Sequence, residues 1–525
     1  MKFTRLLNRS SRSKSTIESP TGKEYLQSNL KQNIQRVKEA LGNSSDIIFR
    51  EVSLSPSGAQ VMGLLYTDGL ADQKIINDFV AESVMMDLTD QPQNPLSPSD
   101  MFQRLKDFAL TIGGIKEFTD FDTLYNSILS GEAVILLDEY DKGVAVSVQG
   151  WKDRGVNEPS TESVVRGPHE GFSETLRTNT ALVRRKIKDP NLWLESRQIG
   201  RVTKTEVAIM FIKGVASDEV IEEVRVRLDR IDIDGILESG YIEELIQDET
   251  YTPFPTIKNS ERPDVIAAEL LEGKVAILVD GTPFVLVVPA LFVSFIHAAE
   301  DYYQRADIST LVRILRYIGI FITLLFPSLY IAITTFHQEM LPTPLVLGLA
   351  AQREGVPIPA FIEALMMEVA FEVLREAGLR MPRVIGPAVS VVGTLVIGQA
   401  AVEAGIVSAA MVIVVAVTAI SSFIFPSYNM SNTFRMLRLP MMGLAASFGL
   451  FGIFVGVIAI LLHLCSLRSF GVPYMSPFAP MIALDQKDAI FRFPRWAMFS
   501  RPRLISQKNV TRGQKSPSQK PEPRK

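Results

Sequence analysis

Three glutamates stand at four-residue intervals inside an otherwise apolar stretch of the chain. If residues 360–379 form a helix, this spacing places Glu368, Glu372 and Glu376 on one face, with Arg375 beside them. Ionisable groups at membrane depth are costly, so they usually face the interior of a helix bundle or a water-filled path. The stripe therefore predicts either an ion pathway or a set of ion pairs between helices.

Both interpretations remain open. In the structural one, Arg375 and its neighbours pair with the carboxylates at the cytoplasmic end and hold helices together. In the functional one, a ring of such helices in an oligomer lines a cation pathway, where carboxylates replace lost hydration. Glu363, on roughly the opposite side of the helix, and Glu403, in a later apolar run, belong to the same group. The candidate ion-pathway residues are Glu363, Glu368, Glu372, Arg375 and Glu403.

Long apolar runs must position these residues. Four runs of about 20 or more mostly apolar residues have the length that crosses a hydrocarbon core. They are residues 311–336, 384–402, 406–425 and 441–465. The glutamate-containing run at 361–374 is a fifth. Together these runs predict an integral membrane protein whose transmembrane domain covers residues 308–470.

The charged residues around these runs predict the topology, but they give two conflicting answers for the side of the C-terminal tail. With residues 1–289 in the cytoplasm, the arginines between the spans fall on the cytoplasmic side, as the positive-inside rule requires. Five crossings would then leave the tail, residues 471–525, outside. That tail is basic, with Lys487, Arg492 and Arg495 among its charges, and so prefers the cytoplasm. The side of the tail is left open.

The first half of the chain carries an internal similarity. DTLYNSILSGEAVILLD at residues 122–138 resembles DVIAAELLEGKVAILVD at residues 264–280. Each has a short helical pattern, a glycine and an apolar strand that ends in Asp. A second strand pattern follows each of them, at 143–148 and 283–288, which predicts two β-hairpins.

We interpret this similarity as two related α/β subdomains, residues 24–157 and 160–289, rather than two coincidentally similar hairpins. The expected fold class is an α+β bilobed cytoplasmic domain followed by an α-helical multi-pass transmembrane bundle. The two lobes could close around a small ligand or form a rigid assembly platform. Between lobes and spans, residues 290–303 predict an amphipathic helix, too short to cross alone, in an interfacial or re-entrant segment at 290–305.

Composition narrows the class of protein. The chain has 525 residues and a net charge of -4, with a mean hydropathy of +0.17 that averages a polar first half and an apolar second half. The basic N-terminus, residues 1–23, has no apolar core and is not a secretory signal peptide. The single cysteine, Cys465, excludes an intramolecular disulfide. Nothing supports nucleophilic or metal catalysis, so we expect no enzyme, cofactor or metal.

Several longer blocks resemble the A subunits of GerA-type spore germinant receptors. In the first half they are VVRGP (164–168), TPFP (252–255), ERPD (261–264), KVAILVDGTPFVLVVP (274–289) and EDYYQR (300–305). In the second half they are EALMMEVAFEVLREAGLRMP (363–382), IGQAAVEAG (397–405) and SFGVPYMSP (469–477). The resemblance runs from about residue 25 to residue 480, and the long blocks are specific.

The resemblance implies a multi-pass protein of the spore inner membrane with a cytoplasmic N-terminal domain. It implies a transporter-like B subunit that binds the germinant and a lipoprotein C subunit as partners. It also implies self-association into a ring, with a pentamer expected, that opens an ion path when nutrient binds. Residues 361–375 would then line the pore.

Three hypotheses follow. The first is a germinant-receptor subunit that forms a nutrient-gated cation channel. The second is an accessory subunit of the dipicolinate release machinery, because a group resembling stage V sporulation protein AF shares the same blocks. The third is a non-conducting membrane scaffold that collects partners.

Overall fold

The computed structural model of the chain describes residues 24–54, 61–78, 80–81, 100, 102–104, 106–107, 109, 114–150, 158–159, 162, 164–380, 398–507 and 509–512. Contacts divide the chain into an N-terminal unit, residues 1–152 with 188–190, and a main unit, residues 153–187 with 191–525. The basic N-terminus, most of the predicted span 384–402 and the last thirteen residues lie outside the described residues.

The N-terminal unit is built on an antiparallel sheet in the order β1-β2-β4-β5-β3. Its strands are β1 (Ile47–Ser53), β2 (Val61–Thr67), β3 (Ile115–Phe118), β4 (Ala133–Leu137) and β5 (Gly143–Val146). Helices α1 (Leu30–Ala40) and α4 (Phe121–Leu129) pack through the cluster that holds Leu65 and Val134. The alternate residues Leu64 and Ile135 belong to a second cluster. Because both sets are buried, β2 and β4 are nearly continuous apolar runs.

The main unit repeats this plan with the sheet order β6-β7-β9-β10-β8. Its strands are β6 (Leu192–Ile199), β7 (Thr205–Ile212), β8 (Lys258–Ser260), β9 (Val275–Val279) and β10 (Val285–Val288). Its helices are α5 (Leu176–Lys186), α6 (Asp218–Asp229), α7 (Ser239–Ile246) and α8 (Pro263–Leu271). α6 and α7 pack on one cluster of sheet residues, and α5 and α8 on the other.

The two predicted hairpins are present as β4–β5 and β9–β10. The glycine of each repeat lies between the helix and the first strand of its hairpin. Gly131 has φ +85° and Gly273 has φ +93°, a region that other residues rarely adopt. A Cβ on Gly273 would also stand 2.8 Å from the Val215 carbonyl oxygen. The internal similarity of the sequence therefore corresponds to two sheets of the same strand order.

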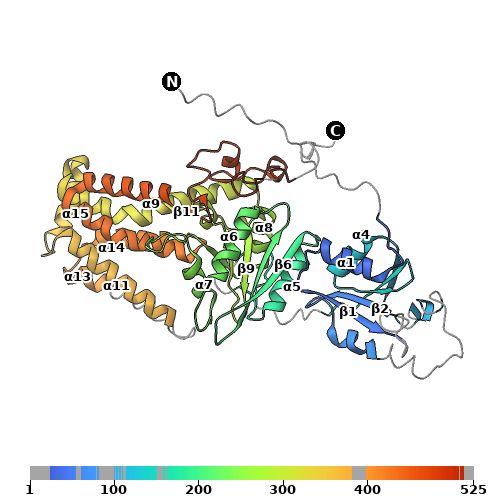
Figure 1. Cartoon of the computed structure of the whole chain (residues 1–525). Coiled ribbons are helices and arrows are strands. Elements are labelled where there is room, and N and C mark those ends of the chain that lie inside the picture. The colour runs from blue at the N-terminus through green and yellow to red at the C-terminus, as the bar shows by residue number, and fades with distance from the viewer. Residues whose placement is uncertain are drawn as a thin grey trace, which may run out of the picture. The chain divides into compact units, whose positions relative to one another are not determined.

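The helices that follow the sheet in the main unit lie side by side, at the opposite end of the unit from the sheet (Figure 1). They are α9 (Ala306–Phe336), α10 (Thr343–Arg353), α11 (Ala360–Arg380), α13 (Gly398–Glu403), α14 (Ala409–Ser422) and α15 (Tyr428–Ser466). Among the described residues, α9 and α15 are long and apolar enough to cross a membrane. The predicted span 406–425 is wrong in length, because α14 has only 14 residues.

The predicted span 441–465 is also wrong, because the chain reverses inside it. Gly449 has φ 60° and ψ -140°, which no helix contains. A Cβ on Gly452 would meet the Leu444 carbonyl oxygen, and one on Gly456 would lie 2.5 Å from the Met441 sulfur. Such contacts between residues 8 and 15 positions apart require two antiparallel arms. α15 is therefore a helical hairpin, with arms at 428–448 and 450–466.

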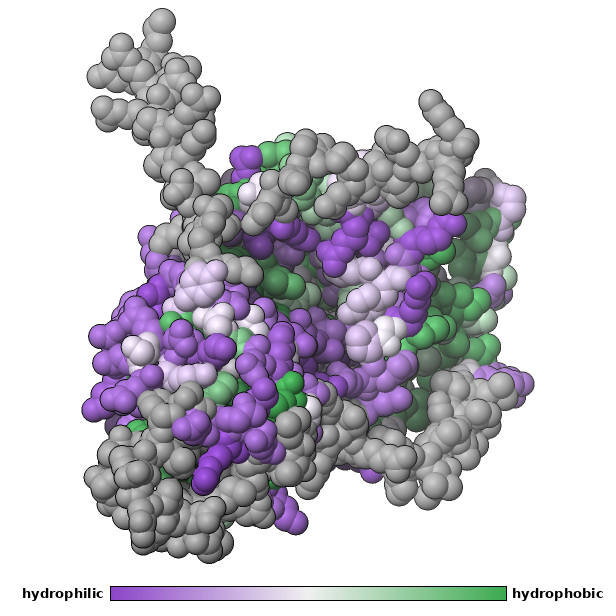
Figure 2. All heavy atoms as spheres, turned by 90° about the vertical axis from the view of Figure 1, so that its right-hand side faces the viewer, coloured by the Kyte–Doolittle hydropathy of each residue, from purple (hydrophilic) through white to green (hydrophobic). Residues whose placement is uncertain are grey.

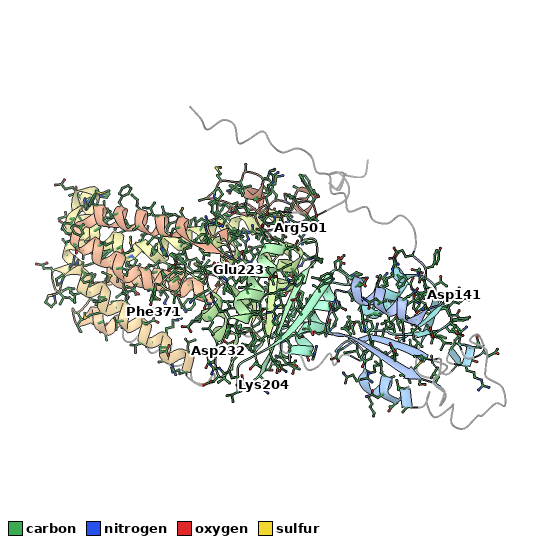
Figure 3. The ribbon with its side chains drawn as sticks, viewed as in Figure 1. Asp141, Lys204, Glu223, Asp232, Phe371 and Arg501 are labelled. Carbon is green, nitrogen blue, oxygen red and sulfur yellow. The ribbon has the colours of Figure 1, made fainter. Side chains whose placement is uncertain are left out.

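The second arm returns the chain to the sheet of the main unit. His463 Nε2 lies 2.8 Å from Thr252 Oγ1, and Ser469 Oγ donates to the Thr256 carbonyl at 2.7 Å. Farther along, Arg501 Nε donates to the Leu271 carbonyl at 2.8 Å and Ser506 Oγ to the Val215 carbonyl at 2.9 Å. Figure 3 shows Arg501 on this C-terminal segment. The described part of the tail thus lies against the end of α8 and against segments next to β7 and β8.

The predicted amphipathic helix over 290–303 is absent. Two 3₁₀ segments stand in its place, η2 (Phe292–Phe295) and η3 (Ala299–Tyr302). Phe292, Phe295 and Ile296 are buried in a cluster with residues from both arms of α15. The apolar side chains that suggested a lipid-facing surface instead pack on protein.

Exposed apolar side chains concentrate on the helices of the main unit. They include Leu311, Leu315 and Phe321 on α9, Ile413 and Ile420 on α14, and Phe451, Phe454 and Leu462 on α15. Figure 2 shows apolar side chains gathered on one part of the surface, while much of the rest is polar. An apolar surface of this extent is typical of contact with lipid or another protein.

Candidate functional site

The glutamate stripe of α11 forms a polar ladder with the first arm of α15. Glu368 Oε2 lies 2.6 Å from Arg438 Nη2, and Glu372 Oε1 accepts from Arg435 Nη2. Arg375 Nη2 donates to Tyr428 Oη at 2.8 Å and to Asn432 Oδ1 at 3.3 Å. Positions that rise along α11 meet positions that fall along α15, as two antiparallel helices require. The contacts therefore come from residues spaced by four and three positions along α11, which lie on one face of that helix. They hold α11 against the first arm of α15.

The Glu368–Arg438 pair is the buried part of this ladder. Both side chains are only 4% exposed. Glu368 Oε1 and Arg438 Nε are buried and have no hydrogen-bond partner among the described residues. A buried ion pair compensates the loss of hydration only when its remaining polar atoms are also bonded. This pair leaves two such atoms unbonded.

Glu363 lies apart from the stripe and is fully buried. Its Oε1 accepts hydrogen bonds from the Ser408 backbone N–H at 2.6 Å and from Ser408 Oγ at 2.5 Å. Ser408 also caps α14, since its side chain accepts from the Met411 N–H. Arg353 Nε stands 3.9 Å from Glu363 Oε2. Glu363 thus joins α11 to the start of α14 and the end of α10.

The structural interpretation of the stripe gave Arg375 and its neighbours as the partners of the glutamates, and it is wrong for Arg375 itself. Arg375 contacts Tyr428 and Asn432, and its guanidinium lies 5.4 Å from the Tyr428 ring centre. Arg438 and Arg435 pair with Glu368 and Glu372, and Arg380 pairs with Glu376 within α11. Glu403 is an exposed residue whose Oε1 accepts from Gln399 Nε2 at 2.8 Å, within its own helix. Glu403 is therefore not brought to the stripe.

A second polar network, which the sequence did not reveal, connects η3, α9 and the C-terminal segment. Asp301 Oδ2 accepts from Arg313 Nε at 3.0 Å and from Arg316 Nη1 at 2.7 Å. Arg313 Nη1 also donates to Asp488 Oδ1 at 2.8 Å, and Tyr302 Oη donates to Asp488 Oδ2 at 2.8 Å. Burial alone would raise the pKa of Asp301, but Arg316 and Arg313 hold it below its ordinary value. We call these residues the junction.

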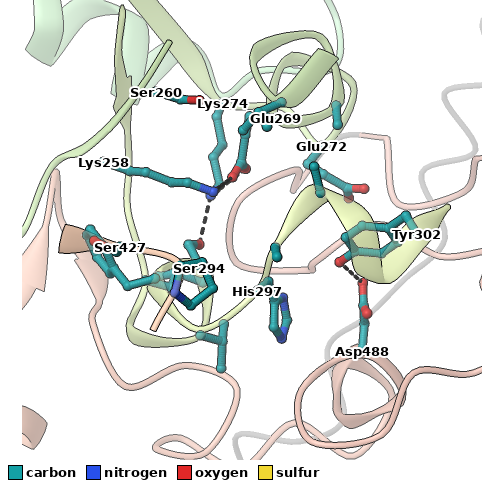
Figure 4. Close-up of a pocket in the computed structure, with 18 of the residues that line it drawn as sticks. Lys258, Ser260, Glu269, Glu272, Lys274, Ser294, His297, Tyr302, Ser427 and Asp488 are labelled. Carbon is teal, nitrogen blue, oxygen red and sulfur yellow. Dashed lines mark hydrogen bonds and ion pairs between the residues drawn. The ribbon is translucent and has the colours of Figure 1, made fainter. Parts of the chain in front are cut away.

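Beside the junction lies a cavity of about 810 Å³. Its wall combines residues of β8, α7 and α8, the 291–303 segment, the 423–429 turn and the C-terminal segment. On one side Glu269 lies between Lys274, at 2.7 Å, and Lys258, at 2.9 Å (Figure 4). Burial alone would raise the pKa of Glu269, but the two lysines lower it to about 2. The cavity has the size of a small-molecule site.

Glu243 on α7 gives the cavity a pH-dependent group. Burial raises the pKa of Glu243 to about 7, opposed by a hydrogen bond from Asn259 and reinforced by Glu238. Because this pKa lies above the ordinary 4.5, ionisation is penalised in the folded state. The stability that protonated Glu243 contributes is complete below about pH 4.5 and is lost as the pH rises through 7.

We therefore expect Glu243→Gln to flatten the dependence of the melting temperature on pH. Between about pH 5 and pH 8, the wild-type protein should lose several degrees more than the variant. The exposed neighbour Glu244 offers a matched control, since Glu244→Gln should leave the slope unchanged. Equal slopes in the wild type and in Glu243→Gln would contradict the assignment.

Comparison with known proteins identifies relatives along nearly the whole chain. The family model of the Bacillus/Clostridium GerA spore germination protein matches residues 35–504. Spore germination protein KA of Bacillus subtilis (strain 168) is 49% identical over 494 residues, which cover 94% of this chain and 89% of that protein. Spore germination protein GerLA of Bacillus cereus is 38% identical over 486 residues, 93% of this chain and 97% of that one.

Two further relatives are a membrane protein and a solved N-terminal domain. Membrane protein YfkQ of Bacillus subtilis (strain 168), itself uncharacterized, is 44% identical over 495 residues, 94% of each chain. The crystal structure of the N-terminal domain of the A subunit of the Bacillus megaterium spore germinant receptor GerK3 is 40% identical. The match covers 52% of this chain and 98% of the GerK3 chain, with a TM-score of 0.42.

Proposed function

The chain belongs to the GerA family of spore germination proteins, and we propose that it is the A-type subunit of a nutrient germinant receptor. In this proposal, copies of the chain assemble into a nutrient-gated cation channel in the spore inner membrane, and its opening triggers germination. The observation that carries the channel is the carboxylate stripe of α11, with Glu368 and Glu372 on a largely apolar helix. Carboxylates at membrane depth mark ion paths when they face water.

The membrane arrangement is part of the proposal. If straight, the 39-residue α15 would be about 58 Å long, nearly twice a hydrocarbon core. Folded at Gly449, its arms are each about 25–30 Å long, which suits two crossings. The second arm then brings the tail to the side of the sheet-containing units, which we place in the cytoplasm. An even number of crossings agrees with the basic tail, where an odd number did not.

The partners are proposed on family grounds. A transporter-like B subunit would bind the germinant, and a lipoprotein C subunit would complete the receptor. Self-association into a pentamer would bring five α11 helices around one axis. α11 supports this role because Val369 and Val373 are more than half exposed and Glu372 is about half exposed. A helix with apolar and acidic exposed positions can face both protein and water.

Within one chain, arginines occupy the place of a permeant cation. Arg438 and Arg435 neutralise Glu368 and Glu372, so the stripe as it stands offers no free carboxylate pair to an ion. In the proposed cycle these contacts belong to the closed state, and α11 exchanges Arg435 and Arg438 for permeant cations on opening. The same contacts also suit the non-conducting scaffold, so conductance must discriminate between the two functions.

The test is conductance of the receptor complex in liposomes. We expect nutrient-dependent cation flux that falls about tenfold or more in Glu368→Gln and Glu372→Gln, because each change removes a charge from the path. Glu354→Gln, at an exposed position, is the matched control and should conduct like the wild type. Flux that is unchanged in both stripe variants would remove the stripe from the mechanism, and a complex without flux would favour the scaffold.

A further inference from the structure

The cavity beside the junction has a charge pattern that points to a class of ligand. Its cationic side chains already have partners. Lys258 and Lys274 share Glu269, and Lys274 Nζ also donates to Ser294 Oγ at 3.0 Å. Arg262 Nη2 pairs with Asp264 Oδ2 at 2.8 Å. Figure 4 shows Lys258, Lys274 and Ser294 converging around Glu269 at one wall.

The remaining cations of the wall are engaged as well. Arg512 pairs with Glu272, and Arg316 pairs with Asp301 at 2.7 Å. Lys487 lies 4.7 Å from the Phe499 ring centre, and Arg495 lies 5.8 Å from that of Tyr302. The wall therefore presents no lysine or arginine that lacks an interaction among the described residues.

Three glutamates of the same wall, unlike most of its lysines and arginines, have no oppositely charged hydrogen-bond partner among the described residues. Glu162 Oε2 accepts from Ser260 Oγ at 2.5 Å, and Glu243 Oε2 accepts only a long bond of 3.5 Å from Asn259 Nδ2. Glu238 accepts from Ser239, Gly240 and Thr282, at 2.6, 2.5 and 2.9 Å. All these donors are uncharged. No ion pair to these glutamates is found among the described residues.

Burial makes the charges of Glu162 and Glu243 costly, because neither has an ion-pair partner among the described residues, although Lys258 and Arg262 offset part of this cost for Glu162. Glu238 is exposed; burial alone would raise its pKa, but its hydrogen bonds hold that pKa below the ordinary value. Burial raises the pKa of Glu162 and of Glu243. A ligand that supplies positive charge would remove this cost. The described residues contain no group of three or more side chains placed to hold a metal ion. Glu238 and Glu243 lie on or next to α7, and Glu162 comes from a separate segment of the wall. Carboxylates spread along a large cavity suit an extended organic ion better than a single metal.

We propose that this cavity binds a small organic cation bearing protonated amines, held by Glu162, Glu238 and Glu243. This site is independent of the proposed conduction through α11. Its wall also includes the 423–429 turn between α14 and α15 and the C-terminal segment. The cavity thus lies between the sheet side and the helix side of the main unit, and a ligand bound in it stabilises the state that holds the cavity.

Three four-carbon probes of different charge test the proposal on the full chain in detergent by isothermal titration calorimetry. They are putrescine, the neutral 1,4-butanediol and the dianion succinate. We expect putrescine to bind and to raise the melting temperature, and the other two to do neither. Equal or tighter binding of butanediol or succinate would overturn the proposal, as would the absence of putrescine binding up to about 10 mM.

Variants locate the site. Glu243→Gln and Glu162→Gln should each weaken putrescine binding about tenfold or more, since each removes one charge-assisted hydrogen bond. Glu244→Gln, at the exposed neighbour of Glu243, should bind like the wild type. Unchanged affinity in both cavity variants would place putrescine elsewhere and refute the site. If one variant fails to fold, as judged by its melting curve, the other variant and the wild-type probe ranking still decide.

Discussion

Replacing Arg438 by Gln should lower the unfolding free energy of the helical part by about 3–5 kcal/mol. The change leaves Glu368, which is 4% exposed, without its counter-charge inside the bundle. Loss of one partner of a buried pair costs more than the pair contributes, because the other charge remains buried. The measurement is denaturant unfolding of the purified protein in detergent, followed by circular dichroism.

Two controls separate this effect from a general loss of charge. Arg380 pairs with Glu376 on the surface of the same helix α11, with side chains 80% and 54% exposed, so Arg380→Gln should cost at most about 1 kcal/mol. The double replacement Glu368→Leu with Arg438→Met should recover most of the stability, since apolar residues often substitute for a buried pair at no net cost. Equal losses in Arg438→Gln and Arg380→Gln would show that the ladder is not a buried pair in the folded protein.

Replacing Arg313 by Gln should have a similarly large effect, about 3–5 kcal/mol, at the junction. The Arg313 side chain is fully buried and serves two acids, Asp301 and Asp488, from different parts of the chain. Arg316 would remain as a partner of Asp301, but Asp488 would keep only the hydroxyl of Tyr302. Thermal unfolding in detergent and limited proteolysis would measure the loss, with cleavage expected first in the C-terminal segment.

Arg305 is the matched control for Arg313. It pairs with Asp307 at 3.0 Å near the start of the same helix, but both side chains are more than half exposed. Arg305→Gln should therefore change stability by at most about 1 kcal/mol. Comparable destabilisation by Arg305→Gln and Arg313→Gln would show that burial at the junction does not govern the energetics. Protection of the C-terminal segment in Arg313→Gln would show that Asp488 does not anchor it.

The repeats were predictable from the sequence because their signals are local. In each repeat a short helical pattern, a glycine and a continuous apolar run lead into the hairpin, β4–β5 or β9–β10, and Gly131 and Gly273 hold backbone angles that other residues avoid. The apolar runs of β2 and β7 were also visible as strands, whereas β1, β3, β6 and β8 were not predicted. β6 has exposed or half-buried residues at most positions from Trp193 to Gln198, so its pattern does not stand out from a loop.

The helical part was harder to predict because apolar runs do not record where a chain turns. No charge interrupts residues 441–462, so the run reads as one span although it contains a reversal. The stripe of Glu368 and Glu372 was visible as helical spacing. Its partners were not, since Arg438 and Arg435 reach it only through the packing of α15 on α11. Spacing along one helix reveals a face, and only tertiary structure reveals what covers that face.

The uncharged reversal at Gly449 also bears on how the chain is made. A loop without charges crosses a bilayer at little electrostatic cost, so under the proposed arrangement of two crossings both arms of α15 would enter the lipid as one pair. The residues that follow, up to Cys465, complete the pair before the C-terminal segment has been synthesised. The contacts of Asp488 and the later contacts of Arg501 and Ser506 therefore form only after both arms of α15 have been synthesised.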